Sequence, residues 1–357
     1  MNDDCLKLTA YFGERQRVSG RFVADAMLEL YGRRRVATSV MLRGIGGFGA
    51  RQKLRTDESL SLSEDPPVAV AAVDARGKIQ ALVDDVVALT PRGVVTLERA
   101  RLADEVIGTA AAPLGVATKL TVYVGRQERA LGVPAYQAVC DLLFERRLAG
   151  ASAFLGVDGT AHGQRIRARF FSRNVNVPMM IIAVGGRDEI AAVLPELDAL
   201  LPRPLLTIER ARICKRDGKL LGRPDSLPDV DQRGLPLWQK LMVYTSEADR
   251  HNGLPIHRAL VRRLRESGTV SGATVLRGIW GFHDDQKPHG DRLLQLTRRV
   301  PVTTIIVDTP DNIARCFDIV DEATAEHGLV TSEMVPALVA IDGARRRGST
   351  RLADYSY

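Results

Sequence analysis

The stretch "LKLTAYFGERQRVSG", residues 6–20, occurs in three related forms along this 357-residue chain. The second form is "TKLTVYVGRQERALG" at residues 118–132, and the third is "QKLMVYTSEADRHNG" at residues 239–253. A lysine, a tyrosine, an arginine and a final glycine keep their places in all three. Self-similarity of this kind indicates that one structural unit is repeated.

Each repeat has an alternating order of strand and helix patterns. In the first repeat, Leu6, Leu8 and Ala10 alternate with polar neighbours, which is typical of a half-buried strand. Helical spacing of apolar residues follows at 21–34 and 78–90, and strand patterns cover 37–45, 66–73 and 94–102. The order βαββαβ predicts an α+β fold built from ferredoxin-like units.

The repeats set the expected domain boundaries. We expect units at residues 1–104, 116–216 and 237–343, with a linker at 217–236 that is rich in glycine, proline and aspartate. Residues 344–357 form a basic tail that we expect to be disordered.

The third strand of each unit is apolar at consecutive positions, as in "VAVAAV" at residues 68–73. Such runs belong to strands that are covered on both faces. Helices cover only one face of a ferredoxin-like sheet, and the other face would be a large exposed apolar patch. We therefore predict that the three sheets pack against one another around a pseudo-threefold axis, as a single-chain, monomeric pseudo-trimer.

Composition limits the classes of function. The start of the chain has no pattern of a secretory signal, no segment is apolar enough for a membrane span, and the four cysteines lie far apart. We therefore expect a cytoplasmic protein, and we expect it to have no metal centre. A net charge of +7 favours an anionic ligand or partner.

Two glycine-rich segments, "RGIGGFGARQK" at 43–53 and "RGIWGFHDDQK" at 277–287, follow the second strands of the first and third units. Converging backbone N–H groups could bind an anion here. The alternative is a tight bend in which glycine supplies positive φ and Phe48 fills the core. The candidate ligand-binding residues are Arg43, Gly44, Gly47, Phe48, Gly49, Gln52, Lys53, Arg277, Gly278, Gly281, Phe282, Gln286 and Lys287.

The fourth strands carry a second candidate set. In "VVTLERARL" and "LLTIERARI" the charged residues lie close together and could contact phosphate or ribose between units, although an ion-pair ladder is an equal alternative. The third unit, with "SEMVPAL", breaks this pattern. The candidates are Glu98, Arg99, Arg101, Glu209, Arg210 and Arg212.

The repeated unit, the long connection after the second strand and the "GFGxRQK" pattern at its root resemble the PII-like signalling proteins. The chain more closely resembles an uncharacterised bacterial branch of that superfamily, domain of unknown function 190, through "LKLTAYFGERQRVSG" and "GATVLRGIWGF". The resemblance implies a non-enzymatic sensor that binds a small ligand, commonly an adenine nucleotide, in clefts between units. It also implies that the long loops contact a protein partner, with a membrane transporter or channel as a candidate.

The sequence departs from the PII pattern in places that concern the ligand. The phosphate-binding loop after the second helix is missing, Ala50 is inserted in the glycine segment, and the second unit has Leu155 and Thr160 where the first has Arg43 and Phe48. The alternative that the protein is an adaptor that binds no ligand therefore stays open. Nucleic-acid binding is not favoured, because the central strands lack aromatic residues. Catalysis is not favoured either, because no nucleophile–base pairing recurs.

Overall fold

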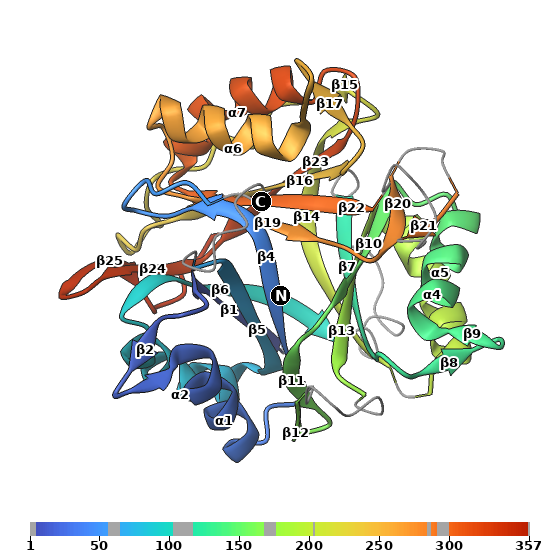
Figure 1. Ribbon diagram of the computed structural model, residues 1–357, viewed down its shortest axis with the longest axis horizontal. Coiled ribbons are helices and arrows are strands. Elements are labelled where there is room, and N and C mark those ends of the chain that lie inside the picture. The colour runs from blue at the N-terminus through green and yellow to red at the C-terminus, as the bar shows by residue number, and fades with distance from the viewer. Residues whose placement is uncertain are drawn as a thin grey trace.

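The computed structural model describes residues 5–55, 65–102, 117–167, 176–202, 204–283, 287–290 and 300–355. Three α+β units surround a common centre, and each unit places a pair of helices on the outside of the molecule (Figure 1). The prediction of three ferredoxin-like repeats in a pseudo-trimer is confirmed.

The units have matching elements. The first unit contains β1 (Cys5–Gly13), β2 (Arg17–Val18), β3 (Arg21–Phe22), α1 (Val23–Arg33), β4 (Thr38–Phe48), β5 (Pro67–Ala75), α2 (Arg76–Leu89) and β6 (Arg92–Leu102).

The second unit contains β7 (Ala117–Gly125), β8 (Arg129–Ala130), β9 (Val133–Pro134), α4 (Ala135–Glu145), β10 (Gly150–Leu155), β11 (Asp158–Ala161), β12 (Gln164–Arg167), β13 (Pro178–Gly185), α5 (Arg187–Leu200) and β14 (Leu205–Arg216), followed by β15 (Lys219–Leu220).

The third unit contains β16 (Trp238–Ser246), β17 (Arg250–His251), β18 (Leu254–Pro255), α6 (Ile256–Ser267), β19 (Ala273–Arg277), β20 (Trp280–His283), β21 (His289–Gly290), β22 (Pro301–Asp308), α7 (Pro310–Ala323), β23 (Leu329–Val335), β24 (Ala337–Asp342) and β25 (Arg345–Ser349).

Both faces of each sheet are buried, as the continuous apolar runs predict. On β13, Met179 and Ile181 belong to the core between the sheet and helices of the second unit. Their neighbours Met180 and Ile182 belong to a separate core that all three units share at the centre. Alternate side chains of one strand therefore fill two cores, because successive residues point to opposite faces.

Strands that cross between units close the three sheets into one assembly. The second strand of each unit extends onto a neighbour, through β4 with β19, β20 with β10 and β11 with β4. The fourth strands also join, through β6 with β14, β14 with β23 and β24 with β6. We call the boundary between two units, where such strands pair, a seam.

The C-terminal tail corrects the sequence prediction. Residues 344–357 were expected to be disordered, but β25 pairs with β24, and Leu352 and Ala353 are buried. The backbone N–H of Ala353 donates a hydrogen bond to the carbonyl of Pro336 at 2.8 Å. The tail is ordered because its apolar residues and its backbone find partners on the neighbouring strands, which the arginine-rich composition does not reveal.

Candidate functional site

The glycine segment of the first unit forms part of a seam. The backbone of Gly47 pairs with Thr274 of the third unit on one side, and its N–H donates to the carbonyl of Arg55 on the other. Gly47 has a φ of 142°, and an added Cβ would lie 2.2 Å from the carbonyl oxygen of Ala273. Glycine is required here because two backbones approach closely.

The same close approach recurs at the other two seams. An added Cβ would lie 2.2 Å from the Ala151 carbonyl oxygen at Gly281, and 2.0 Å from the Ser39 carbonyl oxygen at Gly159. At Gly44 and Gly278 it would also meet backbone carbonyl oxygens, at 2.9 Å and 3.1 Å. The structure thus gives four glycines that were predicted to bind a ligand a role in joining the units: Gly44, Gly47, Gly278 and Gly281.

The two phenylalanines of the glycine segments fill the core of a neighbouring unit. Phe48 is 5% exposed and packs in the helix-side core of the third unit. Phe282 packs in the corresponding core of the second unit, where its ring and that of Phe144 form a T-shaped pair at a centroid distance of 5.3 Å. In the second unit Thr160 takes this place, and its hydroxyl lies 2.9 Å from that of Ser39.

The two predicted arginines of the second strands are paired with glutamates. Arg43 forms an ion pair with Glu14, and Arg277 forms one with Glu247. Each glutamate follows the first strand of the same unit, so the first and third units share this arrangement. The second unit lacks it, because Leu155 replaces the arginine and Arg126 replaces the glutamate.

The remaining residues of the glycine segments lie nearer the surface. Gly49, Lys53 and Lys287 are exposed. The side-chain amide of Gln52 donates to the Val270 carbonyl at 3.5 Å, which ties this segment to the third unit. Gln286 lies outside the described residues.

The structure separates the charged residues of the fourth strands. The arginines lie off the axis: Arg99 donates to the Ala353 carbonyl at 2.5 Å, and Arg212 pairs with Asp225. Arg101 and Arg210 are half-buried. The glutamates Glu98 and Glu209 instead point into the centre of the molecule, because successive residues of a strand face opposite sides.

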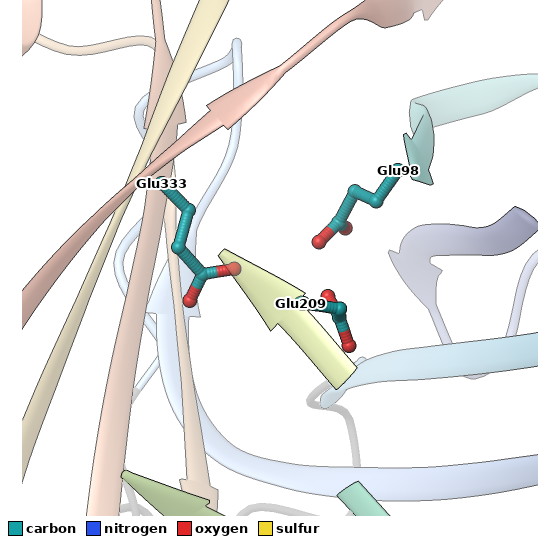
Figure 2. Close-up of side chains that lie close together, drawn as sticks. All are labelled: Glu98, Glu209 and Glu333. Atoms are coloured by element: carbon teal, nitrogen blue, oxygen red, sulfur yellow. The ribbon is translucent and has the colours of Figure 1, made fainter. Parts of the chain in front are cut away.

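Three carboxylates meet at the pseudo-threefold axis. Glu98, Glu209 and Glu333 come from β6, β14 and β23, and one carboxylate oxygen of each lies within 4.8 Å of those of the other two (Figure 2). All three are buried. The third unit therefore keeps the glutamate of the fourth-strand pattern, as Glu333, although it lacks the arginines.

Three buried lysines complete this cluster, which we call the axial cluster. Each lysine lies opposite the glutamate of its own unit in the strand register: Lys7 with Glu98, Lys119 with Glu209 and Lys240 with Glu333. The ammonium groups also reach other units. Lys7 is 3.2 Å from Glu209, Lys119 pairs with Glu333, and Lys240 pairs with Glu98.

The pKa shifts in the axial cluster reflect burial opposed by ion pairing. Burial by itself would raise the pKa of Glu98, but the ammonium groups of Lys240, Lys7 and Lys119 lower it far below its usual range. The pKa of Glu209 is lowered for the same reason, by Lys119 and Lys7. Burial lowers the pKa of Lys119, although Glu209 and Glu333 oppose this shift.

The axial cluster is suited to holding the units together. Carboxylates this close favour a divalent cation in general. Here three ammonium groups contact the same three carboxylates, with Lys119 Nζ at 2.7 Å from Glu209 and Lys240 Nζ at 2.9 Å from Glu333. The repeated lysine was visible in the sequence, but it was not recognised as a partner of the glutamates.

Comparison with known proteins agrees with the three repeats. The model of the DUF190 family, described as "Uncharacterized ACR", matches residues 5–102, 117–213 and 238–337. The chain belongs to the DUF190 family. Among curated relatives, it is similar to the UPF0166 protein of Aquifex aeolicus, with 33% identity over 99 residues, covering 28% of this chain and 90% of that protein.

A second relative also matches about one repeat of this chain. The UPF0166 protein MJ1524 of Methanocaldococcus jannaschii is 30% identical over 90 residues, covering 25% of this chain and 82% of that protein. One DUF190 repeat thus corresponds to most of either relative. In the described part of this DUF190 chain, no helix has the length and hydropathy of a membrane span.

Proposed function

We propose that this protein is a non-enzymatic, PII-like regulatory protein that binds a small anionic ligand at its seams. The observation that carries the proposal is the position of the long connections that follow the second strands. Each begins from a strand that has just paired with a neighbouring unit: β4 before residues 49–66, β11 with β12 before 168–177, and β20 before 284–300. A ligand at a seam would therefore contact two units and the root of a connection.

The arginine–glutamate pairs could couple the binding of an anion to a change in the long connections. The side chain of Arg43 is 56% exposed, and that of its partner Glu14 is 24% exposed. A phosphate or carboxylate could displace Glu14, because charge-assisted hydrogen bonds from arginine to such anions are strong. That exchange would alter the contacts at the root of the connection, which would then present a changed surface to a protein partner.

The two pairs suggest that the seams are not equivalent. Arg43 with Glu14 and Arg277 with Glu247 recur in the first and third units, while the second unit has Leu155 and Arg126. We therefore expect two ligands per chain. An adenine nucleotide is the first ligand to test, and a membrane transporter or channel in contact with the cytoplasm is the first partner, both from the resemblance to PII-like proteins.

The test is calorimetric titration with ATP, ADP, AMP and inorganic phosphate. Arg43→Ala combined with Arg277→Ala is expected to weaken binding without lowering the melting temperature. Arg146→Ala is the matched control, because Arg146, directly after α4, forms an exposed pair with Glu196 of α5 in the second unit. Equal affinity in all three proteins would remove these arginines from the site.

A ligand-independent adaptor is the second candidate. It is favoured by the same ion pairs, since both arginines already have carboxylate partners. A ligand present at 100 times its Kd should raise the free energy of unfolding by about 2.7 kcal/mol. No stabilisation by any of these anions would favour the adaptor.

The burial of three thiols argues against nucleophilic catalysis by these cysteines. Cys140, Cys214 and Cys316 are buried. Burial raises the pKa of Cys214 and Cys316 to about 12, so the nucleophilic thiolate is rare at neutral pH.

A further inference from the structure

The C-terminal hairpin carries a row of exposed arginines at the edge of the sheet. Arg345, Arg346 and Arg347 of β25 are all exposed. β25 pairs with β24 along one side, and no other strand of the described residues pairs with its outer side. We call β25 with these arginines the basic edge. It projects from the body of the molecule (Figure 1).

The basic edge is held firmly in place. β24 pairs with β6 of the first unit along its whole length, from Ala337 opposite Leu97 to Asp342 opposite Arg92. Beyond β25, Ala353 is fully buried and bonds to Pro336. A binding surface that is ordered in advance loses little conformational entropy on binding.

The surroundings of the basic edge leave it positively charged. Asp342 lies at the end of β24, and it is shared by Arg51 at 3.3 Å and Arg92 at 3.2 Å. One carboxylate thus faces two arginines, beside the three arginines of β25. Arg347 also lies over the ring of Trp238, 5.3 Å from its centroid, which fixes its position.

We propose that β25 is the docking edge for an acidic, extended segment of a partner protein, which adds to the sheet as a further strand. The outer N–H and C=O groups of an edge strand supply the main-chain hydrogen bonds of such an addition. Arginine side chains on both faces of β25 match acidic residues at consecutive positions of the incoming strand. A second copy of this chain does not fit, because arginines would then lie opposite arginines.

This docking edge is separate from the pairs of Arg43 and Arg277, and it stands whether or not the seams bind a ligand. A nucleic acid would meet the arginines through its phosphates but would leave the backbone edge unused. The unpaired side of β25 therefore favours a peptide over a nucleic acid.

Fluorescence anisotropy of a short labelled peptide that carries glutamates at consecutive positions tests the proposal. Arg345→Glu combined with Arg346→Glu is expected to weaken binding by at least roughly tenfold, because like charges then face each other. Arg76→Glu combined with Arg262→Glu changes the net charge equally at exposed positions elsewhere, and should retain most of the affinity.

Two further probes separate the mechanisms. The same peptide with alternate backbone amides N-methylated keeps its charge but loses N–H donors, and it is expected to bind at least roughly tenfold more weakly. Equal binding of the methylated peptide, or no binding of the parent peptide, would overturn the proposal. So would displacement of the peptide by duplex DNA at a lower concentration than unlabelled peptide requires.

Discussion

The ammonium group of Lys7 lies 3.2 Å from the carboxylate of Glu209, although the two residues belong to different repeats and are 202 positions apart. Equivalent contacts join Lys119 to Glu333 and Lys240 to Glu98. Each repeat therefore supplies charges that another repeat helps to neutralise. Since an unpaired buried charge is costly, the three units depend on one another for stability.

The first prediction concerns the axial cluster. Glu209→Ala is expected to lower the free energy of unfolding by about 3–5 kcal/mol, because it leaves Lys7 and Lys119 buried with one carboxylate fewer. Chemical denaturation measures this. Glu196→Ala, which breaks the exposed pair with Arg146, is the control and should have little effect. Similar losses in both variants would show that the cluster has no special role.

The second prediction is an acid-dependent loss of stability. The folded-state pKa values of Glu98 and Glu209 lie below the ordinary value, so the unfolded chain binds more protons in acid. The contribution of these pairs is fully present above the unfolded pKa of about 4.3, and it is lost as the pH falls from there toward the folded pKa values. Denaturation at pH 7 and pH 3.5 measures the loss. A variant with Glu98→Gln and Lys240→Met should lose less between the two pH values than the parent protein, and an equal loss would contradict the assignment.

The third prediction concerns the seam glycines. Gly47→Ala places a Cβ 2.2 Å from a carbonyl oxygen at a φ of 142°, and it should cost about 1–3 kcal/mol for the backbone strain alone. Gly49→Ala, two residues further on, meets nothing within 4 Å and should be tolerated. Thermal denaturation of both variants decides whether the segment is a seam or a free loop. A stable Gly47→Ala variant would argue for a free loop.

The fourth prediction concerns the phenylalanine that crosses a seam. Phe48→Ala should destabilise the protein by about 3–5 kcal/mol, since it leaves a cavity in the core of the third unit. Phe22→Ala is the control, because Phe22 is 38% exposed at the surface of the first unit. Equal denaturation midpoints for the two variants would show that Phe48 does not anchor the seam.

The repeat "LKLTAYFGERQRVSG" and the alternation of strand and helix patterns were sufficient to predict the ferredoxin-like units, because these patterns depend on local spacing. Continuous apolar runs in the third strands, such as 179–184 in the second unit, also predicted that both sheet faces are buried, which the two cores on either side of β13 confirm. The prediction that the tail at 344–357 is disordered was wrong, because its order depends on pairing with β24 rather than on composition.

The candidate site was predicted less well. The sequence drew attention to Glu98 and Glu209, but it grouped them with neighbouring arginines that face the opposite side of the strand. It did not connect them to Lys7 or to Glu333, because contacts across a pseudo-threefold axis have no fixed separation along the chain. Local spacing thus determined the repeated unit and its buried faces, while the tertiary structure alone decided which charges meet at the axis and which glycines lie at a seam. The physical reason is that these contacts form between units, where the geometry of assembly sets the distances.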